Sequence, residues 1–321
     1  MNVAVIFPGQ GAQAPGMGLE LAQAYPATAG AVFRAADGVL GYRLGRLIAA
    51  GDQRLLARTE LTQPALLAAS LAAWRALRAE LPRLEPACAA GLSLGEYSAL
   101  AAAEAVDLAE VFRLVSWRGR YMEEAARATP GGMSAVLGLE RSAVESICAG
   151  TTDAGFGQVW VTNYNAPGQN VIAGVVTAVT EASSRVVASG GKVVPLKVNG
   201  AYHSPLMTAA RQRLAAILAT TPWRTPLFPV YSNVTARPHR GVADIVLGLA
   251  AQVTSAVLWE DIVRDMGARG IETFVELGPG KTLAALVGRI LPGARVLNVY
   301  DQASLRQAVA ALGHYALGVV S

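Results

Sequence analysis

The sequence of 321 residues has few of the side chains that build disulfide frameworks or metal centres. It contains two cysteines, Cys88 and Cys148, and three histidines that lie far apart along the chain. Cysteines in such apolar or helical surroundings are typical of buried, reduced side chains. No grouping of cysteine and histidine has the spacing of metal ligands. We therefore expect neither a disulfide scaffold nor a bound metal.

Charged residues are also scarce, at 16% of the sequence, and Lys192, Lys197 and Lys281 are the only lysines. The net charge is +4, without basic runs, so nucleic acid is not expected as a partner. The longest apolar stretch, residues 64–74, is too short to span a membrane. The N-terminus lacks the basic region and cleavage site of a signal peptide. We expect a cytoplasmic protein without a membrane segment.

What the sequence does contain is a hydrophobic fraction of 53%, arranged as strands that alternate with helices. Residues 3–7 and 86–91 predict buried strands, and a long Ala/Leu helix is predicted to open at Gln63-Pro64. Later strands are predicted at 228–232 and 273–277, and helices at 94–105, 204–218 and 243–252. This order is typical of an α/β fold with a parallel sheet.

The stretch from 128 to 199 has a different rhythm. It predicts a strand, a helix, two strands, a helix and a strand, which is the β-α-β-β-α-β order of ferredoxin-like units. We therefore predict an inserted ferredoxin-like subdomain at 128–199. The flanking parts, 1–127 and 200–321, are predicted to form one large α/β-hydrolase-like subdomain with a parallel sheet.

The strongest local motif is Gly91-Leu92-Ser93-Leu94-Gly95, a G-x-S-x-G pattern between a predicted strand and a predicted helix. The pattern is that of a nucleophile elbow, in which a sharp turn exposes the serine hydroxyl. The helix that follows directs free backbone N–H groups at the same place. In a chain rich in Ala and Gly the pattern also arises by chance, so Ser93 is a candidate nucleophile whose role depends on a nearby base.

Three histidines are available as that base. His203 lies where an apolar strand ends and a helix begins, at the sheet edge where α/β enzymes hold functional groups. His239 follows Arg237-Pro238 in a polar turn and is predicted to be solvated. His314 lies in a predicted C-terminal helix, as a surface or packing residue. His203 is therefore the first candidate.

Arg118 lies on the apolar face of a helix predicted to begin at Asp107. A buried guanidinium is costly unless it meets a carboxylate. The residues alone leave three interpretations open: an internal salt bridge, an arginine that reaches out to solvent, or a bidentate site for a substrate carboxylate.

Six motifs occur in an order that carries a specific resemblance. They are Phe7-Pro8-Gly9-Gln10-Gly11, Thr62-Gln63-Pro64-Ala65, Gly91-Leu92-Ser93-Leu94-Gly95-Glu96-Tyr97, 163–168, Gly200-Ala201-Tyr202-His203 and Gly278-Pro279-Gly280-Lys281. Over essentially its whole length the chain resembles the malonyl-CoA:acyl-carrier-protein transacylases and the related acyltransferases of polyketide synthases.

The resemblance implies roles for the candidate residues. Ser93 would be the nucleophile and His203 its general base, with the backbone carbonyl of Gln252 orienting the imidazole. Arg118 would bind the malonyl carboxylate. The remaining implied site residues are Gln10 and the N–H of Leu94 for the oxyanion hole, and Gln63 and Asn165 along the cavity.

The resemblance also implies a ping-pong transfer of malonyl from coenzyme A to the phosphopantetheine thiol of an acyl carrier protein, in polyketide or fatty acid biosynthesis. Coenzyme A thioester is the donor substrate, and no bound cofactor is expected. Carrier proteins are acidic, which suits a chain with a pI of about 9.2, and we expect a monomer. Basic residues near the motifs are Arg211, Arg213, Lys281 and Arg289.

Two positions depart from the family pattern. Leu92 stands where the family usually has histidine, and a leucine at this position resembles some stand-alone polyketide acyltransferases. Ala256 stands where the family often has proline before the tryptophan, here Trp259. Tyr202 is bulky, like the phenylalanine common in malonyl-specific members. A ring there is predicted to disfavour a methylmalonyl group relative to malonyl by about 1–3 kcal/mol. The hydroxyl of Tyr202 leaves open the possibility that the substrate is an unusual extender unit.

Three other functions remain open. One is an editing hydrolase that removes acyl groups from carrier proteins, although such enzymes tend to lose the arginine present here at Arg118. Another is an acyltransferase for a different or carrier-bound acyl group. The third is a non-catalytic module that docks a carrier protein, which would keep its function after Ser93→Ala.

Overall fold

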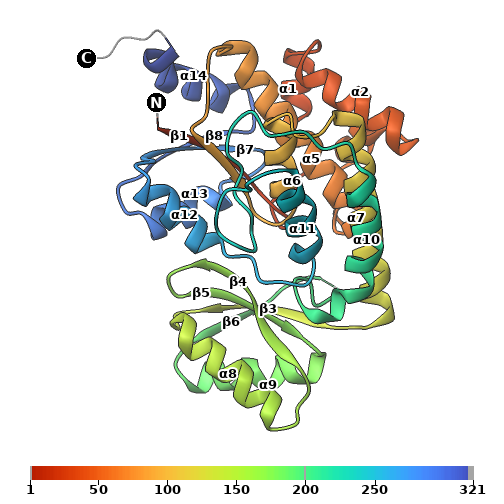
Figure 1. The fold of residues 1–321 in the computed structure, drawn as a ribbon, viewed down its shortest axis with the longest axis vertical. Helices are drawn as coiled ribbons and strands as arrows, with labels where there is room; N and C mark the ends of the chain where they lie inside the picture. The colour runs from red at the N-terminus through yellow and green to blue at the C-terminus, as the bar shows by residue number, and fades with distance from the viewer. Residues whose placement is uncertain (1, 199, 317–321) are drawn as a thin grey trace.

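The computed structural model describes residues 2–198 and 200–316, arranged as a large and a small lobe (Figure 1). The predicted subdomain limits at residues 1, 199 and 321 lie outside the described residues. The large lobe holds a parallel sheet between helices, and the small lobe holds a separate antiparallel sheet. The predicted α/β fold class is therefore confirmed.

The sheet of the large lobe has the strand order β2-β1-β7-β8, with every pairing parallel. The strands are β1 (Val3–Phe7), β2 (Cys88–Gly91), β7 (Thr273–Leu277) and β8 (Arg295–Val299). Successive side chains of β1 point to opposite faces: Val5 and Phe7 enter one core cluster, and Ile6 enters another. Burial on both faces explains why this strand is a continuous apolar run.

Helices cover both faces of this sheet (Figure 1). The helices of the large lobe are, in chain order, α1 (Leu19–Ala24), α2 (Ala29–Leu40), α3 (Leu44–Ala50), α4 (Gln53–Leu56), α5 (Thr59–Glu80), α6 (Leu94–Ala102), α7 (Leu108–Ala128), η1 (Pro205–Met207), α10 (Thr208–Thr220), α11 (Val242–Gln252), α12 (Trp259–Ala268), α13 (Thr282–Ile290) and α14 (Gln302–Ala316). Within residues 2–198 and 200–316, no helix is both long and apolar enough to cross a membrane.

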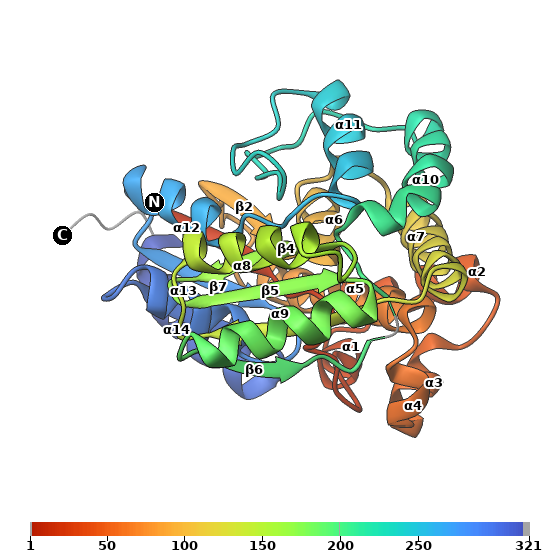
Figure 2. The same cartoon turned by 90° about the horizontal axis from the view of Figure 1, so that it is seen from below.

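The small lobe follows the predicted β-α-β-β-α-β order. Its elements are β3 (Gly132–Leu137), α8 (Arg141–Asp153), β4 (Val159–Ala166), β5 (Gln169–Gly174), α9 (Val176–Ala188) and β6 (Lys192–Pro195). The sheet order is β4-β5-β3-β6, and all its pairings are antiparallel. Helices α8 and α9 cover one face of the sheet, and the opposite face is turned toward the large lobe (Figures 1 and 2).

Three expected elements differ from the structure. The helix expected at 204–218 is divided into the 3₁₀ turn η1 and the helix α10. Helix α5 begins at Thr59 rather than at Pro64, which lies inside the helix. In its first turn the Thr62 hydroxyl donates to the Arg58 carbonyl at 2.9 Å, a side-chain bond that supports the turn ahead of the proline. The strand expected at 228–232 is absent. Val230 and Tyr231 form only single bridges, with Ala89 and Pro238, because the chain turns away after one contact beside β2.

The turn from β2 into α6 depends on two glycines that permit close backbone contact. A Cβ on Gly91 would lie 1.9 Å from the carbonyl carbon of Gly95. A Cβ on Gly95 would lie 2.1 Å from the carbonyl oxygen of Phe7. Helix α6 is therefore packed backbone-to-backbone against the end of β1, and Ser93 lies at the bend with a φ of 54°.

This contact predicts that Gly95→Ala lowers the free energy of unfolding by about 1–3 kcal/mol, because backbone must move to admit the methyl group. Chemical denaturation measures the change. Gly288→Ala is the matched control, since Gly288 is helical and has open space around its Cβ position. The control should be neutral or stabilising by up to about 1 kcal/mol. Equal unfolding midpoints for the two variants would contradict the packing argument.

Candidate active site

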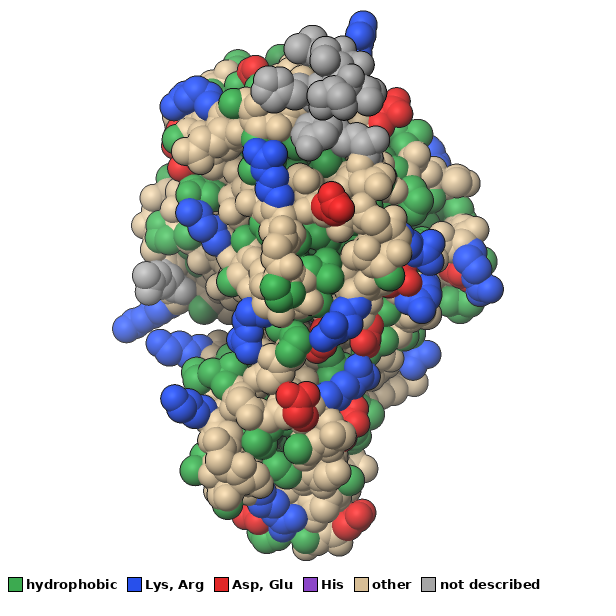
Figure 3. Space-filling model, turned by 90° about the vertical axis from the view of Figure 1, so that its left-hand side faces the viewer, with side chains coloured by type: hydrophobic (Ala, Val, Ile, Leu, Met, Phe, Trp, Pro, Cys, Tyr) green, Lys and Arg blue, Asp and Glu red, His purple; other side chains and the backbone are tan. Residues whose placement is uncertain are grey.

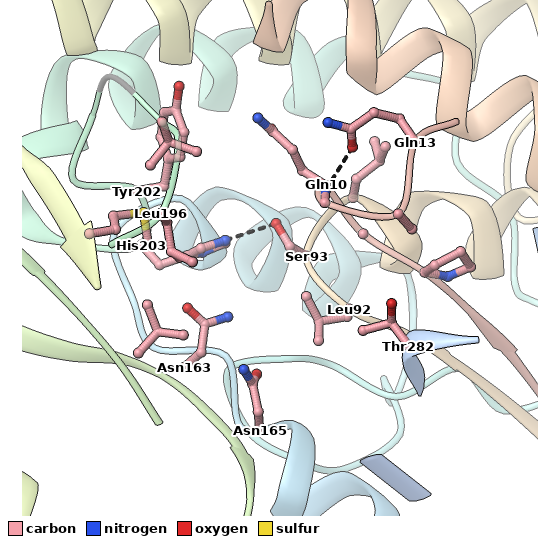
Figure 4. A pocket seen from close by; sticks show the side chains of 18 of the residues that line it. Gln10, Gln13, Leu92, Ser93, Asn163, Asn165, Leu196, Tyr202, His203 and Thr282 are labelled. Carbon is pink, nitrogen blue, oxygen red and sulfur yellow. Dashed lines mark hydrogen bonds between the residues drawn. The ribbon is translucent and has the colours of Figure 1, made fainter. Parts of the chain in front are cut away.

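A cavity of about 620 Å³ lies between the lobes and is lined by residues of both. All the predicted site residues except Gln252 line it, and Gln252 is fully buried behind it. Ser93 and His203 point toward each other across the cavity, and Asn163 and Asn165 reach it from β4 (Figure 4). No cluster of three potential metal ligands occurs in the described parts of the chain.

Ser93 and His203 form a hydrogen bond between Oγ and Nε2 of 2.8 Å. Both residues have a positive φ, 54° for Ser93 and 60° for His203, so both side chains are presented from sharp turns. On the other side of the ring, His203 Nδ1 donates to the backbone carbonyl of Gln252 at 2.8 Å. That carbonyl can only accept, so the tautomer with the proton on Nδ1 leaves the Nε2 lone pair facing Ser93.

The surroundings of His203 keep its imidazole neutral. Burial, and then the positive charge of Arg118, lower its pKa to about 4. The backbone contacts with Gln252 and Ser255 oppose this shift without cancelling it. A neutral imidazole whose free nitrogen faces a hydroxyl is able to accept the hydroxyl proton.

Arg118 comes from the apolar face of α7 and is 1% exposed. Its Nη1 donates to Gln63 Oε1 at 2.8 Å, and its Nη2 donates to Gln252 Oε1 at 2.9 Å and Ser93 Oγ at 3.0 Å. These acceptors are all neutral, and the buried Nε finds no partner among the described residues. Of the three interpretations of this arginine, neither an internal salt bridge nor a solvent-exposed head group describes the structure.

Backbone N–H groups lie beside the serine. Leu94 opens α6, so its N–H has no partner within the helix, and it has none elsewhere in the described residues. Gln10 follows β1 in a loop, and its backbone N–H is likewise without a partner there. The Gln10 side chain instead donates to the Thr59 hydroxyl at 3.3 Å. Both residues line the cavity.

Tyr202 and Asn165 form parts of the cavity wall. The Tyr202 hydroxyl is hydrogen-bonded to the hydroxyl of Thr59 at 2.8 Å, which fixes the ring next to His203. Asn165 has a buried Oδ1 without a partner among the described residues. Leu92, which replaces the usual histidine, lies on the same side of the cavity as Asn165 (Figure 4).

Comparison with known proteins decides the family, because the acyl transferase domain matches residues 4–303. The chain belongs to this family. It is 38% identical over 302 residues to the malonyl CoA-acyl carrier protein transacylase of Haemophilus influenzae, covering 94% of this chain and 96% of the relative. It is also 39% identical to a polyketide biosynthesis protein of Burkholderia thailandensis, over 96% of this chain and 26% of that longer protein.

Solved structures of family members have the same fold. A malonyl-CoA:acyl carrier protein transacylase from Xanthomonas oryzae superposes with a TM-score of 0.92 at 39% identity, covering 97% of this chain and 98% of that one. A malonyl-transacylase in complex with a type II polyketide synthase acyl-carrier protein gives 0.92 at 37% identity, with 96% and 99% coverage. The α/β fold of this family member, with its parallel and antiparallel sheets, is therefore also supported by the solved structures of its relatives.

Three polar residues of this acyl transferase domain were missed by sequence reasoning. The side chain of His239, predicted to be solvated, is 1% exposed and lies 2.9 Å from the Glu96 carboxylate, so that prediction was wrong. Asn233 accepts from the backbone N–H of Ser93 at 2.6 Å and donates to the Gly91 carbonyl at 2.7 Å. Glu96 lies in the elbow motif, but nothing in the sequence pairs it with residue 239 or 233. His314 lies in α14, and its side chain is outside the described residues.

The low pKa of His203 predicts that its ring stays neutral at pH values well below the ordinary histidine pKa. We expect it to titrate with a pKa of about 4, because burial and Arg118 disfavour the imidazolium form. NMR of ¹³C-labelled histidine rings measures the titration, and a His203→Asn variant identifies the signal. A His203 midpoint near the ordinary value of 6.5 would contradict the buried, Arg118-facing environment.

Proposed function

We propose that the chain transfers a malonyl group from malonyl-CoA to the phosphopantetheine thiol of an acyl carrier protein, in polyketide or fatty acid biosynthesis. One observation carries the choice of acyl group: Arg118 is a buried cation with no carboxylate partner among the described residues, 3.0 Å from the hydroxyl of Ser93. A group with a carboxylate beside its reacting carbonyl fits both residues at once. The printed names of the relatives agree with this chemistry.

In the first half-reaction, Ser93 Oγ attacks the thioester carbonyl while His203 Nε2 takes its proton. The bond from His203 Nδ1 to the Gln252 carbonyl stabilises the imidazolium that forms. The backbone N–H groups of Leu94 and Gln10 donate hydrogen bonds to the developing oxyanion. The carbonyl then re-forms, the C–S bond breaks, and coenzyme A leaves with the proton from His203.

In the second half-reaction, the carrier-protein thiol takes the place of coenzyme A. His203 accepts the thiol proton, the sulfur attacks the malonyl-serine carbonyl, and the proton returns to Ser93 Oγ as the ester bond breaks. Each step conserves the acyl group, and neither oxidation nor decarboxylation is involved. Because coenzyme A leaves before the carrier-protein thiol attacks, the kinetic mechanism is ping-pong.

Arg118 is proposed to bind the malonyl carboxylate bidentately. Guanidinium and carboxylate match in planar geometry, and both would be held away from water in this cavity. Gln63 and Gln252 hold the guanidinium from two directions, so its orientation is defined before substrate arrives. Acetyl-CoA lacks the carboxylate and leaves the cation unpaired, which favours malonyl over acetyl.

An acidic carrier protein is the proposed partner. The chain has a pI of about 9.2, and Lys and Arg side chains are scattered over the face in Figure 3, several of them near the narrowing between the lobes. Of the basic candidates, Arg289 lies next to the cavity, because it donates to Gln169, which lines the cavity, and to the Pro167 carbonyl. Arg213 pairs with Glu124, and Lys281 lies over the Tyr300 ring. We propose a cytoplasmic monomer that uses no bound cofactor.

The transfer predicts a covalent intermediate on Ser93. We expect brief incubation with malonyl-CoA to add one malonyl group to the wild-type protein and none to Ser93→Ala. The adduct should persist until holo carrier protein is added, because the thiol is the proper acceptor. Intact-protein mass spectrometry measures both the adduct and its transfer.

Arg118→Ala is the companion variant, since it keeps the Ser93–His203 pair and removes the proposed carboxylate site. We expect it to load malonyl at least about 100-fold more slowly than wild type, as the loss of a buried charged pair implies. Equal loading of wild type by acetyl-CoA would instead favour another acyl group. Rapid loss of the adduct to water would favour the editing hydrolase.

Tyr202 predicts selectivity against branched extender units. We expect Tyr202→Ser to raise the rate with methylmalonyl-CoA relative to malonyl-CoA by about 10-fold or more, because space opens beside the substrate α-carbon. Competition between the two thioesters, read by mass spectrometry, gives the ratio of kcat/KM values. Tyr202→Phe keeps the ring and should keep the malonyl preference. A ratio unchanged in Tyr202→Ser would show that another wall sets selectivity.

A further inference from the structure

Two opposite charges are buried behind the cavity without touching each other. Arg118 is 1% exposed and Glu96 is 0% exposed. The guanidinium bonds only to neutral oxygens within the described residues, and the carboxylate bonds there to no Lys or Arg, its one ionisable partner being His239. An isolated buried charge costs several kcal/mol. Each of these two charges therefore needs a counter-charge close by.

The side-chain amide of Gln252 connects the two. Its Oε1 accepts from Arg118 Nη2 at 2.9 Å, and its Nε2 donates to Glu96 Oε2 at 2.7 Å. The amide dipole is aligned with its negative end on the cation and its positive end on the anion. Such alignment strengthens both bonds in a low-dielectric interior. The same residue holds His203 through its backbone carbonyl.

Glu96 is held in place from two further directions. The backbone N–H of Asn233 donates to Oε2 at 3.0 Å, and His239 Nε2 donates to Oε1 at 2.9 Å. The His239 ring packs on α11 at Gly248, where an added Cβ would lie 3.0 Å from its Cε1. Gly248 and Gln252 are four residues apart and so share one face of α11. Helix α11 thus packs against the His239 ring at Gly248 and, one turn later, donates to Glu96 through the Gln252 side chain.

We propose that Glu96 is a positioning residue that supplies the counter-charge of Arg118 through the Gln252 amide and leaves the guanidinium's remaining donors for a substrate carboxylate. A direct Glu–Arg pair would occupy those donors and close the carboxylate site. Placing the anion one amide away compensates the charge without filling the site. The proposal rests on the proposed function for the identity of that ligand, and on the hydrogen bonds above for the coupling.

The arrangement gives Glu96 two opposite effects. Without substrate, its charge stabilises the buried Arg118. With malonyl bound, the substrate carboxylate takes over as the counter-charge, and Glu96 repels it across a short distance. Removing the charge of Glu96 should therefore destabilise the free protein and strengthen its binding of a carboxylate ligand. A residue that only braces the fold would weaken binding when it is altered.

Glu96→Gln tests the charge at nearly constant shape. The Gln carbonyl can still accept from Gln252 and Asn233, and its NH₂ can donate to Nε2 of the other neutral tautomer of His239. In a Ser93→Ala background, which prevents turnover, calorimetry gives the Kd of malonyl-CoA. We expect Glu96→Gln to lower this Kd at least about 3-fold and to leave the Kd of acetyl-CoA within about 2-fold. Unchanged or weaker malonyl-CoA binding would overturn the proposal.

Thermal unfolding of the free protein tests the coupling separately. We expect Glu96→Gln and Arg118→Gln each to lower Tm by several degrees, and the double variant to lose clearly less than the sum, because neither charge is left alone. Additive losses would overturn the proposal. If Glu96→Gln alone does not fold, recovery of folded protein in the double variant supports the coupling, and its absence overturns it. Glu85→Gln, at an exposed position, is the matched control and should change nothing.

The same set separates this inference from the proposed function. If Ser93→Ala/Arg118→Gln binds malonyl-CoA as well as Ser93→Ala does, Arg118 is not the carboxylate site and the proposed substrate fails. The stability cycle between Glu96 and Arg118 still reports whether the two charges are coupled. If instead Arg118→Gln weakens malonyl-CoA binding and the Tm losses of the two single variants add up in the double variant, the proposed substrate is supported and the proposed role of Glu96 is contradicted.

Discussion

The burial of the Arg118 charge beside a serine is the constraint on which the rest of the site depends. A guanidinium in this position adds to the effect of burial in lowering the pKa of His203, has no carboxylate partner among the described residues, and donates to three neutral acceptors that hold it. Gln252 supplies one of these acceptors and also holds the base, since its side chain binds Arg118 and its backbone binds His203. The end of α11 therefore sets the geometry of the base and of the cation together.

Sequence reasoning reached the parts of the site that local patterns encode. The elbow at Ser93 needs glycines at fixed spacing because backbone approaches backbone there, and that need is visible in the sequence. Arg118 was visible because a charge on an apolar helix face is an anomaly. His203 was singled out as the end of an apolar strand, whereas the structure places it well beyond the end of β6, just before η1, with its Nε2 2.8 Å from Ser93 Oγ. The roles of these residues in catalysis remain predictions, which the variants above test.

The parts that were missed depend on contacts between distant segments. His239 follows a proline in a polar stretch, so its sequence indicated solvent, yet Glu96 and the bare backbone at Gly248 make room for its ring inside. Asn233 holds the Ser93 elbow from the position directly after the strand expected at 228–232, and nothing local marks it. Likewise Pro64 was taken as a helix start, whereas side-chain bonding in the preceding turn lets α5 begin at Thr59. Tertiary contacts explain the first two cases, whereas the start of α5 is a local matter.

The division of the cavity wall between two lobes has an evolutionary consequence. Ser93, His203 and Arg118 all belong to the large lobe, whereas Asn163 and Asn165 reach the cavity from a sheet whose helices pack on a separate core cluster. The backbone of β4 is bonded to Val257 of the large lobe, so side-chain substitutions at Asn163 and Asn165 can reshape the space offered to an acyl chain while these backbone bonds stay in place. Substitutions in the small lobe can thus change which acyl groups the cavity admits, while the reacting residues in the large lobe are retained.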